Sequence, residues 1–303
     1  MTTTTMMMTP TISIEARAKV NLTLEVFGTR PDGYHALRSV VMPITLSDTL
    51  TVRESDALTC DTGFADDLCL KAARALDPAR GAEIRVEKRL PVGGGLGGGS
   101  ADAAAALIAL NRLWGLGRSR DELVRIAARV GSDVPSLTAG GAVVMEGRGE
   151  GVTTLEAAGM PALPLLIVHP NVFVSTAEIF ARYVPPAATR PSATDAMVRA
   201  LAAGDLRAVA AGLMNDLQAT AEALHPEIAA ACAALRETGA AGVSMSGSGS
   251  CVFGIFRTVE DSVRAGAAVA DGHRDWGAYP CVGLPQAAEW PPDSVPVRCP
   301  ASC

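Results

Sequence analysis

The chain has 303 residues and a net charge of −6, with 26 Lys and Arg against 32 Asp and Glu. This acidic balance argues against general nucleic-acid binding, although a local basic pocket remains compatible with it. The length allows two domains, or one large domain with an ample core. Seven scattered cysteines include no Cys-x-x-Cys pair and no Cys/His cluster with zinc spacing, which favours reduced thiols in a cytoplasmic protein.

The start and the middle of the chain differ in composition from the rest. Residues 1–10 are rich in Met and Thr and carry no Lys or Arg, so they predict a disordered extension rather than a signal peptide. Asp102 and Asn111 interrupt the longest apolar run, and no membrane span is predicted. A shift towards Ala and Pro near the middle of the chain predicts two domains, over residues 11–160 and 161–303.

The first predicted element is a half-buried strand, or two strands joined by a bend, over residues 12–26. Every even position in this range is apolar, and a period of two is typical of a strand with one buried face. The odd positions place four polar side chains side by side on the other face: Arg17, Lys19, Asn21 and Thr23. By itself, this polar row is either a solvated surface or part of a functional site.

A turn signal follows at residues 30–33, Arg-Pro-Asp-Gly, and leads directly to Tyr34 and His35. An aromatic ring beside a histidine on a loop can bind a flat ring by stacking and hydrogen bonding. Ordinary packing explains the same pair equally well, so the pattern leaves both interpretations open.

Strands and helices continue to the middle of the chain. Hydrophobic periodicity predicts strands at residues 37–46 and 49–52, meeting at a Ser47-Asp48 turn, then a helix at 67–76, a strand at 82–87, a helix at 118–130 and a strand at 140–145. We expect Gly131-Ser-Asp-Val-Pro135 to stop the second of these helices, because Pro135 cannot continue it. Asp133 then lies in a tight loop, where it could simply cap the turn.

The second half begins with a buried strand at residues 165–169 and a helix at 175–183, opened by Ser175 and Thr176. Further helices are predicted at residues 193–203, 205–214 and 226–238. A second loop rich in Gly and Ser then leads into an apolar strand that ends at Phe256. This loop is either a hairpin turn or one side of a clamp on a ligand.

The most distinctive stretch is Pro91-Val-Gly-Gly-Gly-Leu-Gly-Gly-Gly-Ser100, which has six glycines in seven positions. Without Cβ atoms, the backbone N–H groups can turn inward around a ligand. A run of strong helix formers follows at once, with Ser100 as an acceptable N-cap. The free N–H groups and the dipole at a helix N-terminus favour a phosphate chain, whereas a plain linker would not require so many glycines.

Two other kinds of glycine loop fit the sequence less well. Gly93 and Gly98 have the spacing of a Walker motif, but Gly99 stands where that motif requires Lys. Gly93, Gly95 and Gly98 also satisfy the dinucleotide fingerprint, which needs a strand ending in an acidic residue about 20 positions further on. The acidic residues at that distance open a helical pattern instead, so we do not expect a dinucleotide site.

Three stretches together resemble the GHMP kinase family: the Lys19-Val-Asn strand, residues 91–103 and residues 244–253. The likeness extends over most of the chain. It implies an α+β fold in two domains, with an N-terminal half like ribosomal protein S5 domain 2, a ferredoxin-like C-terminal half, and the site between them. It also implies a cytoplasmic enzyme that moves the γ-phosphoryl group of ATP to an alcohol of a small molecule, with Mg²⁺. No nucleic acid, membrane or obligate protein partner is expected.

Within the family, three segments indicate which group of kinases this chain resembles: Arg30-Pro-Asp-Gly-Tyr-His35, Lys88-Arg-Leu-Pro and residues 131–135. It is similar to the members that phosphorylate the tertiary hydroxyl group of a cytidine diphosphate-linked methylerythritol in the non-mevalonate route to isoprenoids. Mevalonate or homoserine kinases are the alternative, but their substrates carry no base to stack. A non-catalytic nucleotide-binding sensor would lack Lys19 or Asp133, and both are present.

The resemblance also implies roles for individual residues. Asp133 matches the catalytic aspartate and Lys19 its lysine partner, with a proton that leaves late in a loose phosphoryl transfer. Contacts to ATP are expected from Lys88, Pro91, Gly93, Gly94, Gly95, Leu96, Gly97, Gly98, Gly99, Ser100, Gly247, Ser248 and Gly249. Ser100 is also expected near Mg²⁺. Contacts to the substrate are expected from Asn21, Tyr34, His35, Thr176 and Phe180.

Two positions depart from the family pattern. Asp102 follows Ser100-Ala101 where many members have Ser-Ser-Asn. Its carboxylate could help to hold Mg²⁺, but we favour a role as a cap of the helix. Asp67 stands where an asparagine is common, which leaves the contacts to adenine open.

Overall fold

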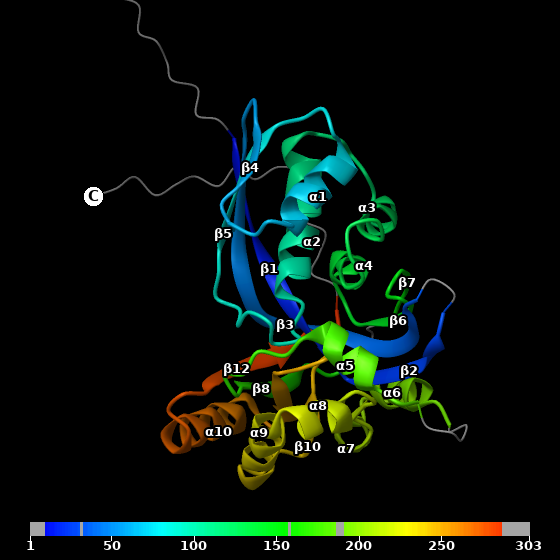
Figure 1. The fold of residues 1–303 in the computed structure, drawn as a ribbon, viewed down its shortest axis with the longest axis vertical. Helices are drawn as coiled ribbons and strands as arrows, with labels where there is room; N and C mark the ends of the chain where they lie inside the picture. The colour runs from blue at the N-terminus through cyan, green and yellow to red at the C-terminus, as the bar shows by residue number, and fades with distance from the viewer. Residues whose placement is uncertain (1–9, 31–32, 157–158, 186–190, 287–303) are drawn as a thin grey trace, which may run out of the picture.

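The computed structural model describes residues 10–30, 33–156, 159–185 and 191–286. Apart from Pro10, the extension predicted at residues 1–10 lies outside these ranges, as do residues 287–303 of the predicted second domain. The described chain forms two lobes of mixed helix and sheet (Figure 1). None of its helices is long and apolar enough to span a membrane.

The N-terminal lobe is a sheet with helices on one side (Figure 1). Its strands are β1 (Thr11–Asn21), β2 (Thr23–Thr29), β3 (His35–Glu54), β4 (Leu58–Cys60), β5 (Ala82–Glu87), β6 (Val143–Gly147) and β7 (Gly151–Thr154). Its helices are α1 (Leu68–Leu76), α2 (Gly98–Leu113), α3 (Arg120–Ala127) and α4 (Val134–Ala139). The period-two pattern at residues 12–26 thus gives two strands, separated at Leu22.

The C-terminal lobe contains a four-stranded antiparallel sheet in the order β10-β11-β8-β12. Its elements are β8 (Leu163–His169), α5 (Thr176–Arg182), α6 (Ala193–Ala202), α7 (Leu206–Ala211), β9 (Met214–Asn215), α8 (Gln218–Leu224), α9 (Pro226–Glu237), β10 (Gly242–Met245), β11 (Val252–Ile255), α10 (Val259–Gly272) and β12 (Gly277–Gly283). This strand order, with α9 and α10 packed on the sheet, is the expected ferredoxin-like arrangement.

The 20-residue strand β3 connects the lobes, and it corrects one prediction. Ser47 and Asp48 lie inside it and pair with Arg17 and Ala16 of β1, so the predicted turn is wrong. Ser-Asp is a turn-favouring pair, but continuous pairing with β1 overrides that local preference. At Ile44, β3 also pairs with Gly283 of β12 in the C-terminal lobe.

A shared hydrophobic core fuses the two lobes. Val20 of β1 and Met42 of β3 belong to the same buried cluster as Leu165 of β8 and Phe253 of β11. Because this core is continuous, the division at residue 160 stays a prediction.

Several helix boundaries differ from the sequence-based predictions: the helix predicted at residues 205–214, for example, ends at Ala211, and Met214 begins β9. Two of the differences lie beside the cavity described below. Helix α2 begins at Gly98, with Gly97 as its N-cap in the left-handed region (φ 72°), so the assignment of Ser100 as the cap is wrong. Pro135 does not end a helix but lies in the first turn of α4, where its fixed φ and missing N–H are tolerated. Residues 128–133 therefore form the connection between α3 and α4.

Candidate active site

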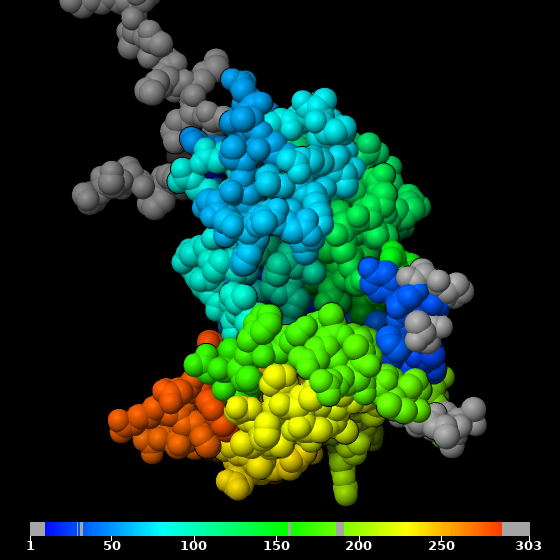
Figure 2. Space-filling model, in the orientation of Figure 1, coloured from blue at the N-terminus to red at the C-terminus, as the bar shows by residue number. Residues whose placement is uncertain are grey.

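A cavity of about 1120 Å³ lies where the two lobes meet, and the surface is hollowed there (Figure 2). It is larger than most single-ligand pockets, so it has room for a nucleotide and a second molecule. The predicted residues that line it are Lys19, Asn21, Tyr34, His35, Lys88, Pro91, Gly93, Gly94, Gly95, Leu96, Gly97, Gly98, Gly99, Ser100, Asp133, Thr176, Phe180, Gly247 and Ser248. Gly249, the last predicted residue of the second loop, does not line the cavity, and an added Cβ there would meet Met245 Sδ at 2.8 Å.

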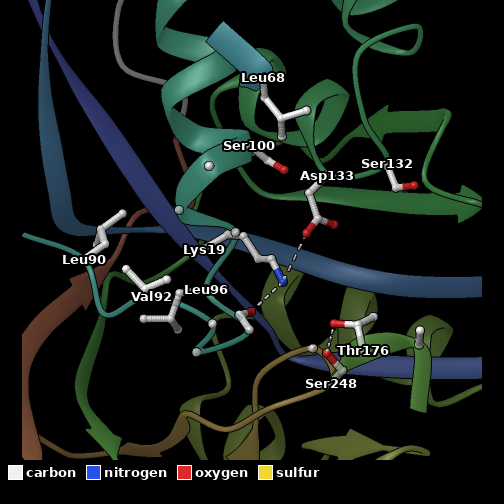
Figure 3. Close-up of a pocket in the computed structure, with 18 of the residues that line it drawn as sticks. Lys19, Leu68, Leu90, Val92, Leu96, Ser100, Ser132, Asp133, Thr176 and Ser248 are labelled. Atoms are coloured by element: carbon white, nitrogen blue, oxygen red, sulfur yellow. Dashed lines mark hydrogen bonds and ion pairs between the residues drawn. The ribbon is translucent and has the colours of Figure 1, made fainter. Parts of the chain in front are cut away.

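Lys19 and Asp133 come together at the centre of this cavity, although 114 positions separate them in the chain. Lys19 Nζ lies 3.7 Å from Asp133 Oδ2 (Figure 3). The lysine side chain is 3% exposed and the aspartate side chain 30%. The short connection before α4 positions Asp133, whose side chain makes no capping hydrogen bond. Its carboxylate is therefore not occupied with capping the helix.

Hydrogen bonds from the polar row of β1 fix the position of Lys19. Its Nζ donates to Asn21 Oδ1 (2.7 Å) and to the carbonyl oxygen of Gly95 (2.9 Å). Asn21 Nδ2 in turn donates to Ser39 Oγ (2.8 Å), which sets the amide oxygen towards the lysine. Lys19 and Asn21 are buried, because the glycine loop and Ser39 of β3 pack beside this part of the row. The solvated-surface interpretation fails for these two residues.

The glycine loop between β5 and α2 packs against the second loop of the C-terminal lobe. The Gly95 carbonyl also accepts a hydrogen bond from Ser246 Oγ (3.0 Å), and the Gly94 carbonyl accepts one from the Cys251 N–H (3.1 Å). Gly95 has φ +72°, and a Cβ added there would lie 2.1 Å from the Ser246 carbonyl oxygen. The two loops therefore pack directly against each other, and the second loop is also the hairpin connection between the paired strands β10 and β11. Its role as one side of a clamp on a ligand stays a prediction.

Two polar side chains hold the second loop in place. Asn215 Nδ2 donates to the carbonyl oxygens of Met245 (2.8 Å) and Gly247 (2.7 Å). Thr176 Oγ1 and Ser248 Oγ lie 2.7 Å apart, which joins this loop to the start of α5 (Figure 3). The role of Asn215 was missed at the sequence level, because an Asn after a helix has no distinctive pattern.

Lys88 lies between two buried carboxylates, Asp48 and Asp102, at distances of 2.5 and 2.7 Å. Burial alone would lower the pKa of Lys88, but the hydrogen bonds and charges of both carboxylates outweigh it and raise the pKa. Burial raises the pKa of Asp102 to about 6, although Lys88 acts in the opposite direction. Asp102 thus forms an ion pair and does not cap α2, which corrects our preferred assignment.

Asp48 anchors the start of the glycine loop, and sequence reasoning overlooked it. It is fully buried, and its Oδ1 accepts hydrogen bonds from the backbone N–H groups of Arg89 (2.5 Å) and Leu90 (2.8 Å). A signal was present in the sequence, because the apolar positions 44, 46, 50 and 52 continue with a period of two through Asp48. A charge on the buried face of a strand requires a partner.

Aromatic side chains gather in another part of the cavity. The His35 ring lies 5.4 Å from the Phe180 ring and 6.3 Å from the Tyr183 ring, measured between centroids. Tyr34 is exposed, with the Arg148 guanidinium 5.0 Å from its ring centroid. His35 therefore packs beside two aromatic rings and also lines the cavity, where Tyr34 is the more exposed of the pair. Arg148 was not among the predicted site residues.

Known proteins with this sequence pattern are kinases. Residues 67–145 match the family of GHMP kinases N terminal domains, and residues 197–274 match the family of GHMP kinases C terminal domains. The 4-diphosphocytidyl-2-C-methyl-D-erythritol kinase of Pelotomaculum thermopropionicum is 42% identical over 268 residues, covering 84% of this chain and 93% of the relative. The kinase of the same name from Symbiobacterium thermophilum is 43% identical, covering 80% and 90%.

Solved structures agree on the fold. A crystal structure of 4-(cytidine 5'-diphospho)-2C-methyl-D-erythritol kinase superposes with a TM-score of 0.76 at 32% identity, covering 90% of this chain and 99% of the other. A homoserine kinase from Cytophaga hutchinsonii gives a TM-score of 0.72 at 22% identity, covering 94% and 98%. The second likeness shows a shared fold alone.

Proposed function

The chain belongs to the GHMP kinase family, and from this premise we propose that it phosphorylates 4-diphosphocytidyl-2-C-methyl-D-erythritol. In this reaction the γ-phosphoryl group of ATP moves to the tertiary 2-hydroxyl group, giving the 2-phosphate and ADP. The observation that carries the proposal is the Lys19–Asp133 pair, which lies in one cavity with the glycine loop and the Tyr34–His35 segment.

Asp133 is the proposed proton acceptor for the attacking hydroxyl group. A free carboxylate has a pKa of about 4, so it cannot deprotonate a tertiary alcohol in advance. The proton instead moves late, as the phosphoryl group is transferred through a loose transition state. Lys19, held by Asn21 and Gly95, stabilises the negative charge that develops on the acceptor oxygen.

The glycine loop is the proposed holder of the ATP phosphates. The loop and the N-terminus of α2 line the cavity, and six of the seven residues 93–99 are glycines without a side chain. Gly247 and Ser248 line the opposite side, so the clamp encloses the phosphates from both lobes. Alignment and charge neutralisation by these groups would supply most of the rate acceleration.

Mg²⁺ fits the residues at the start of α2. Ser100 offers a hydroxyl group, and the buried Oδ1 of Asp102 has no hydrogen-bond partner among the described residues. Hydroxyl and carboxylate oxygens are ligands that Mg²⁺ prefers. Ser100 and Asp102 would hold the ion, which would neutralise phosphate charge.

A substrate panel tests the proposed reaction. Purified protein with ATP and Mg²⁺ is offered the diphosphocytidyl compound, mevalonate and homoserine in parallel, and release of ADP is measured for each. We expect turnover with the diphosphocytidyl compound alone, because only this substrate carries a base for the Tyr34–His35 segment. Comparable turnover with mevalonate or homoserine would overturn the proposed substrate and leave the family assignment intact.

His35→Ala tests the binding of the base. An aromatic contact is worth about 0.5–1.5 kcal/mol, so we expect the affinity for the cytidine substrate to fall roughly two- to tenfold. The affinity for ATP should not change. Calorimetric titration with each ligand separates the two, and His273→Ala is the control, because His273 stacks on Trp276 and does not line the cavity. Equal losses for both ligands would argue against a base-binding role.

The setting of the reaction follows from the same proposal. The substrate is an intermediate of the non-mevalonate route to isoprenoid precursors, so we place the enzyme in that pathway. The cysteines of the described ranges are all free thiols, which supports a reducing compartment such as the cytoplasm.

A further inference from the structure

Three potential metal ligands meet at the edge of the cavity: Cys60, Asp67 and Cys69. Cys60 ends β4, Asp67 is the N-cap of α1, and Cys69 lies in the first turn of that helix. Their ligand atoms all lie within 4.8 Å of one another. Asp67 and Cys69 are buried and Cys60 is partly exposed. The spacing in the sequence predicts no such site, because the fold creates it by placing β4 beside α1.

We propose that these three residues form a binding site for a thiophilic divalent cation such as Zn²⁺. Zinc binds thiolate sulfur at about 2.3 Å and carboxylate oxygen at about 2.0–2.2 Å, in a tetrahedral arrangement. Two sulfur atoms on one zinc ion are then about 3.8 Å apart. The ligand atoms therefore have to approach by on the order of 1 Å at most. A disulfide requires a sulfur–sulfur distance of about 2 Å, which is a larger change.

Hydrogen bonds already orient the carboxylate of this cluster. Asp67 Oδ1 accepts a hydrogen bond from the Leu70 N–H (2.9 Å), and Oδ2 accepts one from Thr62 Oγ1. The Cys60 thiol and the Cys69 N–H also hydrogen-bond this carboxylate, so Asp67 already faces both cysteines. Partners of this kind hold metal-binding carboxylates in position in known sites.

The site has three protein ligands and an open direction. Thr62, Asp67 and Cys69 line the main cavity, so the fourth ligand of a tetrahedral ion would come from water or from a molecule bound there. Structural zinc sites take four protein ligands, whereas three ligands with one open position leave the ion accessible to water or another molecule. The site is thus expected to bind metal reversibly and not to be required for folding.

The experiment is a titration of the reduced, chelator-treated full chain with Co²⁺ and Cd²⁺. It uses a Cys299→Ser/Cys303→Ser background, because these two cysteines lie outside the described residues and could bind the probes. We expect one equivalent to bind, with a thiolate-to-metal charge-transfer band, and Zn²⁺ to displace Co²⁺. Absence of the band in this background would overturn the proposal.

Variants in the same background identify the ligands. Cys60→Ser and Cys69→Ser should each abolish the band, whereas Cys281→Ala, a buried cysteine elsewhere, should keep it. Asp67→Asn should lower the affinity at least about tenfold, since even residues that only orient ligands cost roughly 10–100-fold. Asn is itself a good N-cap, so α1 remains intact. A band that survives Cys60→Ser, or a Cys60–Cys69 disulfide formed with oxidised glutathione in protein that binds no Co²⁺, would contradict the assignment.

Discussion

Asp133→Asn is expected to lower kcat by roughly 10²–10⁴-fold, the usual contribution of general-base assistance. The amide has nearly the same size but cannot accept the proton of the attacking hydroxyl group. Binding should be retained, because Lys19 keeps its hydrogen bonds to Asn21 and Gly95. Steady-state kinetics gives kcat, and calorimetric titration with ATP and with the cytidine substrate gives the two affinities.

The matched control is Asp121→Asn, which removes an exposed carboxylate on α3 outside the cavity. It should leave kcat and both affinities unchanged. Because Asp133 makes no capping hydrogen bond, the melting temperature of Asp133→Asn should fall only by what the lost ion pair with Lys19 contributes. Turnover close to the native rate would show that Asp133 is only a residue of the connection between α3 and α4.

Gly95→Ala is expected to weaken ATP binding at least tenfold and to lower the melting temperature by several degrees. Alanine in the left-handed region costs about 1–2 kcal/mol. The added Cβ would also lie 2.1 Å from the Ser246 carbonyl oxygen, so the two loops of the clamp must separate. At a few degrees per kcal/mol for a protein of this size, thermal unfolding will detect the change. Calorimetric titration with ATP measures the loss of affinity.

Gly99→Ala separates an effect on the ligand from an effect on the clamp. Its Cβ would touch only Leu68, at 3.9 Å, so the fold and the second loop should be unaffected. A loss of ATP affinity in Gly99→Ala without a lower melting temperature would report phosphate beside the start of α2. Gly272→Ala, at the end of α10 with nothing within 4 Å, is the control for the substitution itself. Unchanged ATP affinity in Gly95→Ala would mean that contact between the loops is not needed.

Elements with strong local patterns could be predicted from the sequence. The strand at residues 82–87 has the predicted bounds, and the helix at 67–76 differs only in that Asp67 is its cap. The family resemblance also anticipated the α+β fold and the kinase activity. In each case the prediction rests on residues that are close in the sequence, or on motifs in which the reaction requires particular residue types.

Features that depend on distant pairing could not be predicted in this way. The prediction of a turn at Ser47-Asp48 was wrong because these residues pair with β1. The Asp48 carboxylate also accepts hydrogen bonds from the N–H groups of Arg89 and Leu90, which holds it inside the strand. Lys88 was expected to bind the nucleotide, and its pairing with Asp48 and Asp102 was not foreseen. That expectation stays a prediction.

The long strand β3 has a consequence for how substrates enter. It pairs with β1, β5 and β6 in one lobe and with β12 in the other, and a common core covers the junction. A hinge motion that opened the lobes would break that core, so we do not expect the lobes to separate when a substrate binds. Reactants must instead enter the cavity while the lobes keep their relative position. The Lys19 ammonium group and the Asp133 carboxylate are then in place before the reactants bind. A substrate is then selected by its fit to this fixed cavity, including the Tyr34–His35 segment, and not by closure of the lobes.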